Sequence, residues 1–317
     1  MFISRSKWPI CPVPVNQNRF GALAGKIPPS SNAKTHLAMR LNYALAPIAL
    51  LIIGLATATT EAAKPDRPVQ YSYGDHKDQT LDVYAPKNVS QAPVILMVHG
   101  GAWRFGDKDN KRVVTNKSTR WLAQGYIFIS INYRMVPDLN GLQQADDVAR
   151  ALSYAQAHAS EWGGDPTKFI LMGHSAGAHL VALLNAAPTK AYAFGAKPWL
   201  GTVALDSAAY DIPAVMDQDH YRFYDKAFGR DRRTWELSSP YFVITSEARP
   251  MLAVCSTKRP DKPCNQVHAF ATKAKALNVS VQVLELPLSH AEINEELGLP
   301  SVYTDTVEHF MKSMLPP

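Results

Sequence analysis

A serine flanked by small residues is the strongest chemical signal in the chain. It lies in the run Gly173-His174-Ser175-Ala176-Gly177, between the apolar stretches 169–172 and 178–184. This order predicts a strand, a sharp turn and a helix, with the serine hydroxyl exposed at the turn. Glycine tolerates the tight reversal, and the small residues let the helix approach the strand. Because a serine hydroxyl is a poor nucleophile by itself, a neighbouring base is needed before it can attack a carbonyl carbon.

A second motif could supply hydrogen-bond donors for the same attack. The run His99-Gly100-Gly101-Ala102-Trp103 follows the apolar residues 94–98. A glycine pair lets the backbone come close to a reacting carbonyl, and the tetrahedral intermediate of acyl transfer needs N–H donors aimed at its oxyanion. The motif precedes the serine in the chain, which is the order expected when the two act together.

These motifs resemble the α/β-hydrolase superfamily. More narrowly, they are similar to its carboxylesterase and lipase branch with an HGG(G/A)(W/F) loop, near hormone-sensitive-lipase-like and bacterial feruloyl-esterase-like enzymes. The resemblance extends from about residue 71 to about residue 310. It implies an oxyanion hole formed by the N–H groups of Gly101, Ala102 and Ala176. Trp103 is a candidate for the substrate pocket, or it packs the loop that carries it.

The order serine, acid, histidine of this superfamily indicates the remaining catalytic groups. His290 follows the last predicted strand and is the candidate base. Asp261 is the favoured acid because it is the one carboxylate in the loop 255–264. This loop departs from the G-x-x-D pattern of the family, since Arg259 stands where the acid is expected. Asp206, at the end of the preceding strand, is therefore the alternative acid.

Alternating apolar runs and helical patterns must position these motifs. Such alternation predicts a mostly parallel sheet flanked by helices, with ligands outside the carboxyl ends of the strands. The segment 207–249 interrupts the alternation, contains eight aromatic residues and is expected to form an inserted cap. The expected strands are 93–98, 126–132, 168–173, 201–205, 250–255 and 280–286, and the expected helices are 111–124, 141–160, 176–187 and 264–277.

The charge distribution argues against a nucleic-acid partner. The chain has a net charge of +6, but residues 1–63 hold six basic side chains and one acidic one. The body of the chain is therefore almost neutral and lacks the excess of basic residues that nucleic-acid binding requires. Residues 64–317 are predicted to form a single α/β-hydrolase domain.

The N-terminal segment is typical of a targeting sequence. Residues 39–63 combine a short basic start, an apolar core and small residues suited to cleavage, as in a secretory signal peptide. The apolar core is shorter than the ~20 residues of a membrane-spanning helix. We expect a secreted or periplasmic protein without a membrane span after cleavage; anchoring through this segment is the alternative. Residues 1–38 are a leader of doubtful status, either untranslated or an extension.

Two cysteines of the body bear on the same question of compartment. Cys255 and Cys264 are nine residues apart and could form a disulfide in an oxidising compartment. Alternatively, Cys255 is a small buried residue at the end of a strand. Neither cysteine has the spacing of a metal site, and neither a metal nor another cofactor is expected.

The sequence therefore predicts a serine carboxylesterase. Its partner would be a small or aryl carboxylic ester, hydrolysed through an acyl-enzyme on Ser175, His290 and Asp261. Two alternatives stay open: an amidase of the arylformamidase type, which shares an HGG-type loop, and a non-catalytic binding protein on a hydrolase scaffold. The acyl and alcohol specificity and the oligomeric state are not determined by the sequence.

Overall fold

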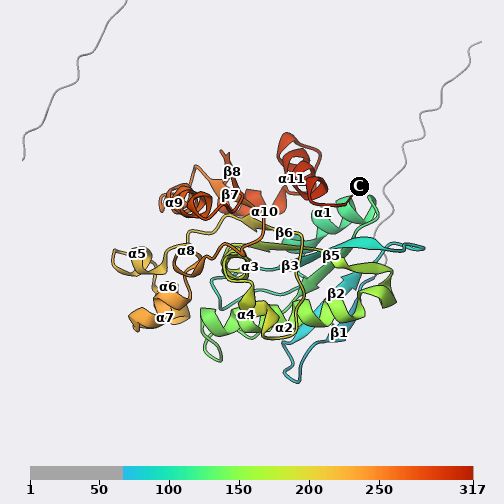
Figure 1. The fold of residues 1–317 in the computed structure, drawn as a ribbon, viewed down its shortest axis with the longest axis horizontal. Helices are drawn as coiled ribbons and strands as arrows, with labels where there is room; N and C mark the ends of the chain where they lie inside the picture. Colours follow the sequence, from blue (N-terminus) through green and yellow to red (C-terminus); the bar gives the residue numbers. More distant parts are fainter. Residues whose placement is uncertain (1–66, 317) are drawn as a thin grey trace, which may run out of the picture. The chain divides into compact units, whose positions relative to one another are not determined.

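A sheet of eight strands forms the centre of the computed structural model, which describes residues 67–316 (Figure 1). The strands lie side by side in the order β1-β2-β4-β3-β5-β6-β7-β8. Their bounds are β1 (Val69–Ser72), β2 (Thr80–Tyr84), β3 (Ala92–Val98), β4 (Ile127–Ile131), β5 (Gly164–His174), β6 (Gly201–Leu205), β7 (Met251–Ser256) and β8 (Val281–Leu286).

The pairing of the strands confirms the prediction of a mostly parallel sheet. The six strands from β4 to β8 in the sheet order are parallel to one another, and β2 is antiparallel to both β1 and β4. All six predicted strands are present, with β5 beginning earlier than expected because Gly164 pairs with Ala92 of β3. The strands β1 and β2 were not among the predicted ones.

The four predicted helices are also present. They are α1 (Lys111–Leu122), α2 (Gly141–His158), α3 (Ala176–Ala186) and α9 (Pro263–Ala276). Side-chain hydrogen bonds define several starts: Asn140 and Gln143 form a capping box at α2, which satisfies backbone N–H groups that have no partner within the helix. The structure adds α4 (Thr189–Tyr192), α10 (His290–Glu295), α11 (Val302–Ser313) and a 3-10 turn at Ala159–Trp162.

Helices cover both faces of the sheet because side chains alternate along each strand. On β3, Val94, Leu96 and Val98 face α2 and α3, and belong to one cluster of buried apolar residues. Ile95 and Met97 belong to a second cluster, with residues of α1, α10 and α11. Central strands buried on both faces read as continuous apolar runs, which is why these strands were predictable.

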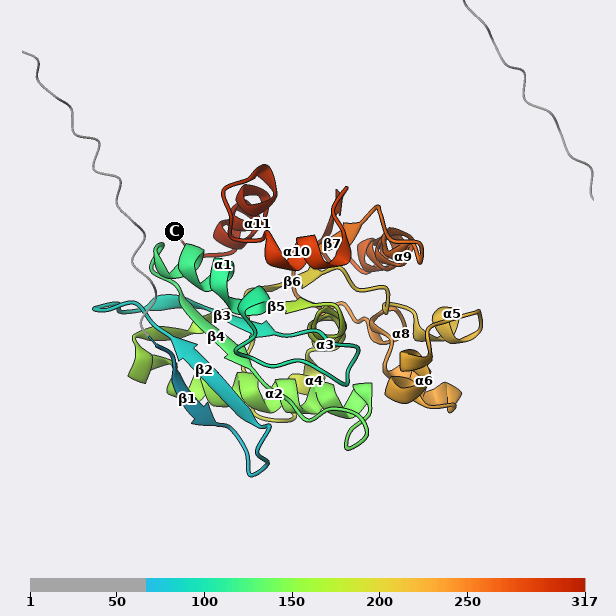
Figure 2. The same ribbon diagram turned by 180° about the vertical axis from the view of Figure 1, so that it is seen from behind.

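Four short helices occupy the predicted cap between β6 and β7. They are α5 (Ile212–Met216), α6 (Arg222–Phe228), α7 (Arg232–Leu237) and α8 (Pro240–Val243). Figures 1 and 2 show α5 and α6 gathered at one side of the sheet, beside α8. Tyr224 and Phe228 of α6 are buried and pack against Trp103.

The described residues all belong to one compact unit of the chain. The predicted leader 1–38 and signal segment 39–63 lie outside the described residues. Between residues 67 and 316, no helix combines the length and apolar character that crossing a membrane requires.

Candidate active site

Ser175 stands at the turn between β5 and α3. Its backbone has φ 56° and ψ −117°, a left-handed conformation that is strained for a residue with a side chain and is found at functional sites. The Ser175 N–H donates to the Leu205 carbonyl oxygen at 2.9 Å. A Cβ on Gly177 would lie 2.1 Å from the Val98 carbonyl oxygen, so only glycine permits α3 to approach β3 this closely.

The HGGAW loop follows β3 and turns sharply beside this serine. Gly101 has φ 123°, Ala102 φ 53° and Trp103 φ 59°. A Cβ on Gly101 would lie 2.0 Å from the Phe105 carbonyl oxygen, which explains the glycine. Ala176 is the first residue of α3, and an N–H at this position has no acceptor within its helix.

One pocket brings the two motifs together. It has a volume of about 570 Å³, and its walls include Gly101, Ala102, Ser175, Ala176 and His290. The two motifs, which follow the carboxyl ends of β3 and β5, therefore lie in one cleft with His290. The other walls are mainly aromatic or belong to the acid loop: Trp103, Phe105, Tyr221, Phe223, Tyr224, Asp206, Arg259 and Asp261.

His290 enters the pocket from the start of α10. A capping box between Ser289 and Glu292 fixes the beginning of this helix. The His290 Nδ1 atom lies 2.6 Å from Asp206 Oδ2. Because an ionised carboxylate only accepts hydrogen bonds, Nδ1 carries the proton and Nε2 keeps its lone pair. A neutral imidazole in this tautomer can accept a proton at Nε2.

Asp206 is completely buried beneath His290. Its Oδ1 accepts the Ser256 N–H at 2.8 Å, and its Oδ2 accepts from Arg259 Nη1 at 3.0 Å as well as from His290. Burial by itself raises the pKa of this carboxyl, but the hydrogen bond to His290, the charge of Arg259 and the Ser256 N–H together hold the pKa below its ordinary value. Asp206 is thus kept as a carboxylate.

The prediction that Asp261 pairs with His290 is wrong for this structure. Asp261 does not contact His290; its carboxylate instead binds Arg259, with Oδ1 2.9 Å from Nε and Oδ2 2.5 Å from Nη2. The carboxylate at His290 is Asp206, the alternative that the sequence left open. The physical reason is the parallel pairing of β6 with β5, which brings the residue after Leu205 next to the turn that holds Ser175.

Three further histidines of the two motifs and of α3 have structural contacts. The His174 Nε2–H donates to the His290 carbonyl oxygen at 2.9 Å, and the two rings lie 4.5 Å apart. Burial lowers the pKa of His174 to about 3 and that of His179 to about 4, so both rings are neutral at pH 7. His99 is also buried and stacks on Tyr133.

Trp103 both packs the loop and lines the pocket. It is 3% exposed, and its indole N–H donates to His179 Nδ1 at 3.1 Å. The other nitrogen of His179 donates to the Ser238 carbonyl oxygen at 2.8 Å. This chain of hydrogen bonds connects the HGGAW loop, helix α3 and the cap, so it fixes the position of the cap over the pocket.

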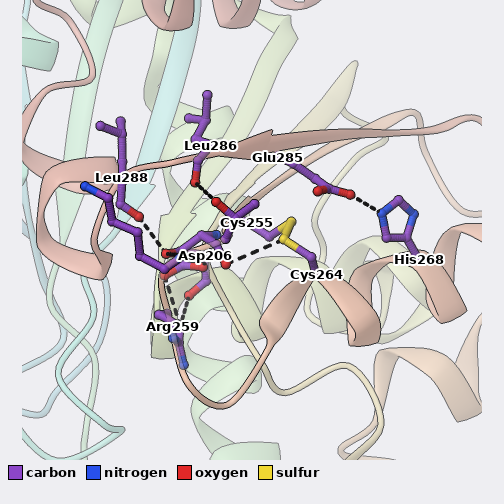
Figure 3. Close-up of a disulfide and its surroundings, with 11 residues drawn as sticks. Asp206, Cys255, Arg259, Cys264, His268, Glu285, Leu286 and Leu288 are labelled. Atoms are coloured by element: carbon purple, nitrogen blue, oxygen red, sulfur yellow. Dashed lines mark hydrogen bonds and ion pairs between the residues drawn. A yellow bond between two sulfur atoms is a disulfide. The ribbon is translucent and has the colours of Figure 1, made fainter. Parts of the chain in front are cut away.

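The acid loop is closed by the disulfide that the sequence suggested. Cys255, in β7, is bonded to Cys264, at the start of α9 (Figure 3). The sequence did not predict the contact of Arg259 with Asp206 in this loop. An arginine in the place of the expected acid was the available signal, because a largely buried guanidinium needs a carboxylate partner.

Comparisons of sequence agree with this architecture. A model of the BD-FAE family matches residues 81–274, which is more than half of the chain. Esterase LipC of Mycobacterium tuberculosis is 29% identical over 231 residues, which cover 68% of this chain and 57% of LipC. A probable isoprenylcysteine alpha-carbonyl methylesterase of Arabidopsis thaliana, ICMEL1, is 36% identical over 111 residues, 35% of this chain and 23% of that protein. The chain spans little more than half the length of the first of these relatives.

Solved structures share the fold. A novel thermophilic esterase from Thermogutta terrifontis, Est2, has a TM-score of 0.63 at 19% identity, with 80% of this chain and 92% of that chain covered. Esterase B from Lactobacillus Rhamnosis has a TM-score of 0.62 at 19% identity, with coverages of 79% and 88%. These structures establish the α/β-hydrolase fold that the motifs suggested, and the family match shows that the chain belongs to the BD-FAE family.

Proposed function

We propose that the protein is a serine carboxylesterase that uses Ser175, His290 and Asp206. The observation that carries the proposal is the buried Asp206 bonded to His290 Nδ1, in the pocket that also contains the strained Ser175. Related proteins named as esterases support the same activity. A binding protein on this scaffold would have no need for a base held in one tautomer in the same pocket as a serine.

The proposed reaction has two halves. His290 Nε2 takes the proton of Ser175 as Oγ attacks the ester carbonyl carbon, and Asp206 stabilises the imidazolium that forms. The tetrahedral intermediate collapses, the bond to the alcohol oxygen breaks and His290 gives the proton to that oxygen. Water then attacks the acyl-enzyme in the same way, releasing the acid and restoring Ser175. The Gly101, Ala102 and Ala176 N–H groups would bind the oxyanion, each contributing ~3 kcal/mol to transition-state stability.

The pocket suits a small or aromatic ester. Its volume of about 570 Å³ is within the range of small-molecule sites. Trp103, Phe223 and Tyr224 form apolar walls around the serine, and such walls favour the transfer of an apolar acyl or aryl group out of water.

Hydrolysis of p-nitrophenyl esters from acetate to laurate tests the activity directly. We expect turnover by the wild type, no measurable turnover by Ser175→Ala, and unchanged turnover by Ser313→Ala, an exposed serine on α11. A fluorophosphonate probe should label Ser175 alone. Faster cleavage of N-formyl anilides than of matched esters would favour the amidase. A folded protein with neither turnover nor label would favour the binding protein.

We also propose that the protein is exported. The Cys255–Cys264 disulfide supports this proposal, because disulfides persist in oxidising compartments. Cell fractionation with mass spectrometry of the product tests it. We expect a chain in the periplasm or medium that has lost the segment up to Ala58 or Ala62. Recovery of an uncleaved chain in the membrane fraction would indicate an anchor instead.

A further inference from the structure

Arg259 touches both members of the acid–base pair. Its Nη1 atom lies 3.0 Å from Asp206 Oδ2, 3.0 Å from the Asp206 carbonyl oxygen and 3.1 Å from His290 Nδ1. The guanidinium is therefore as close to the base as a hydrogen-bonded neighbour would be. Because it is a fixed cation, it acts on the charge of this pair as well as on its geometry.

A second carboxylate fixes the guanidinium from the opposite side. Asp261 binds the Nε and Nη2 atoms of Arg259 with its two oxygens. This paired geometry is stronger and more directional than a single contact. The Arg259 side chain is 17% exposed, so it is held in one orientation between the two acids. Asp261, Arg259, Asp206 and His290 thus form a continuous row.

The backbone around Arg259 is tied down as well. The disulfide joins the two ends of the loop 255–264 (Figure 3). At the start of this loop, the Ser256 N–H binds Asp206 and the Ser256 hydroxyl donates to the Leu288 carbonyl oxygen at 2.6 Å. The loop therefore contacts both Asp206 and the segment that leads to His290. A shift of the loop would displace both of them.

We propose that Arg259 is a positioning residue of the esterase reaction, which holds Asp206 against His290 and opposes the charging of His290. The inference rests on the proposed function. It assigns a role to a residue that stands where related proteins are expected to carry the acid. Asp261, which the sequence favoured as the acid, acts here through Arg259.

Arginine is required for this role because of its planar shape. Nη1 reaches Asp206 while Nε and Nη2 hold Asp261. A lysine at this position keeps the charge but has a single ammonium, which cannot make the same set of contacts. Arg259→Lys thus separates charge from geometry, and Arg259→Met removes both. Lys258→Gln is the matched control, because it removes an exposed cation from the same loop.

The test measures kcat, KM and the pH dependence of kcat/KM on p-nitrophenyl acetate. For Arg259→Met we expect a fall in kcat of about 10- to 100-fold with little change in KM. Loss of a group that positions Asp206 and His290 reduces the stabilisation of the transition state. The acid limb of the pH profile should move to higher pH, because a cation 3.1 Å from the base has been removed. Arg259→Lys should keep the acid limb of the wild type and show an intermediate kcat.

Two controls make the result decisive. Lys258→Gln should match the wild type in kcat and in the acid limb. Fluorophosphonate titration of each variant counts the folded sites with a reactive serine, so a loss of folding is separated from a loss of rate per site. An unchanged kcat and acid limb in Arg259→Met, with wild-type activity that depends on Ser175, would overturn the proposal for Arg259 alone. Activity that is independent of Ser175 would instead overturn the proposed function.

Discussion

Asp206 provides the negative charge that faces His290 Nδ1. It is buried, ionised and hydrogen-bonded on both oxygens. An amide in its place can present an N–H to His290 Nδ1, which then becomes the acceptor and leaves the proton on Nε2. We expect Asp206→Asn to lower kcat/KM on p-nitrophenyl acetate by about 10³- to 10⁴-fold, because the wrong tautomer cannot act as the base. Circular dichroism should show an unchanged fold.

The effect of Asp261→Asn should be compared with that of Asp206→Asn. It removes a charge from the contact with Arg259 but leaves the bond between Asp206 and His290 intact. We expect a loss of less than about 10-fold, since the effect has to pass through Arg259. The opposite ranking, with Asp261→Asn the more damaging change, would return Asp261 to the role of the acid.

The site illustrates what a sequence can indicate about individual residues. Ser175 and His290 could be named because their positions follow from local patterns and from chain order. The acid could not, since Asp206 and Asp261 both follow a strand, and the choice depends on which of them reaches His290 in space. Arg259 could not be identified from the sequence for the same reason. Its proposed role depends on contacts with two carboxylates, and one of them, Asp206, is distant in the chain.

Among the secondary-structure elements, α10 has the most direct influence on the base, because it begins at His290. Its C-terminal end is anchored on α1, where the buried Lys117 Nζ donates to the Asn294 carbonyl oxygen and the Asn116 amide donates to the Glu295 carbonyl oxygen at 2.6 Å. Burial lowers the pKa of Lys117 from 10.5 to about 7. Protonation of Lys117 is therefore coupled to the free energy of unfolding.

The direction of that coupling follows from proton binding. Between pH 7 and 10.5 the unfolded state holds the Lys117 proton and the folded state has lost it, so the free energy of unfolding rises with pH in this window. Lys117→Met should flatten the rise by a few kcal/mol, a quantity measured by urea unfolding from about pH 6.5 to about pH 9.5. Lys111→Met, an exposed change on the same helix, should keep the wild-type slope. Equal slopes for Lys117→Met and the wild type would contradict the coupling.

The elements differ in how far the sequence could predict them. A strand such as β3 lies under helices on both sides, so its residues are apolar without interruption and the run is easily recognised. The cap helices α5 to α8 are four to seven residues long. Helices this short are not stable alone, and their positions depend on contacts such as those of Tyr224 and Phe228 with Trp103, which no local pattern contains.

At the scale of the whole molecule, each of several neighbouring strands is followed by one part of the site. The strands β3, β5, β6, β7 and β8 are adjacent in the sheet. The residues after their carboxyl ends are, in that order, the HGGAW loop, Ser175, Asp206, the loop with Arg259, and the segment with His290. Because parallel strands end at one edge of a sheet, this fold assembles the site from segments far apart in the chain.

The disulfide is the covalent constraint on this edge of the sheet, and its effect on the whole molecule can be separated from its effect on the site. It closes a short loop, with a separation of nine residues. The double variant Cys255→Ala/Cys264→Ala should lower the free energy of unfolding by about 2–3 kcal/mol, because the unfolded chain regains the freedom that the bond removed. For a domain of this size the loss corresponds to a fall in Tm of about 5–10 °C.

Calorimetry and kinetics on the same samples check this prediction. Well below the Tm of the variant, kcat should fall less than in Arg259→Met, because the contacts of Arg259 with Asp206 and Asp261 can still form without the bond. Treatment of the wild type with dithiothreitol, with both thiols counted by mass spectrometry, should reproduce the lower Tm. A reduced protein with an unchanged Tm would show that folded contacts alone hold the loop. A loss of kcat equal to that of Arg259→Met would show that the loop keeps Arg259 in place only while the bond is closed.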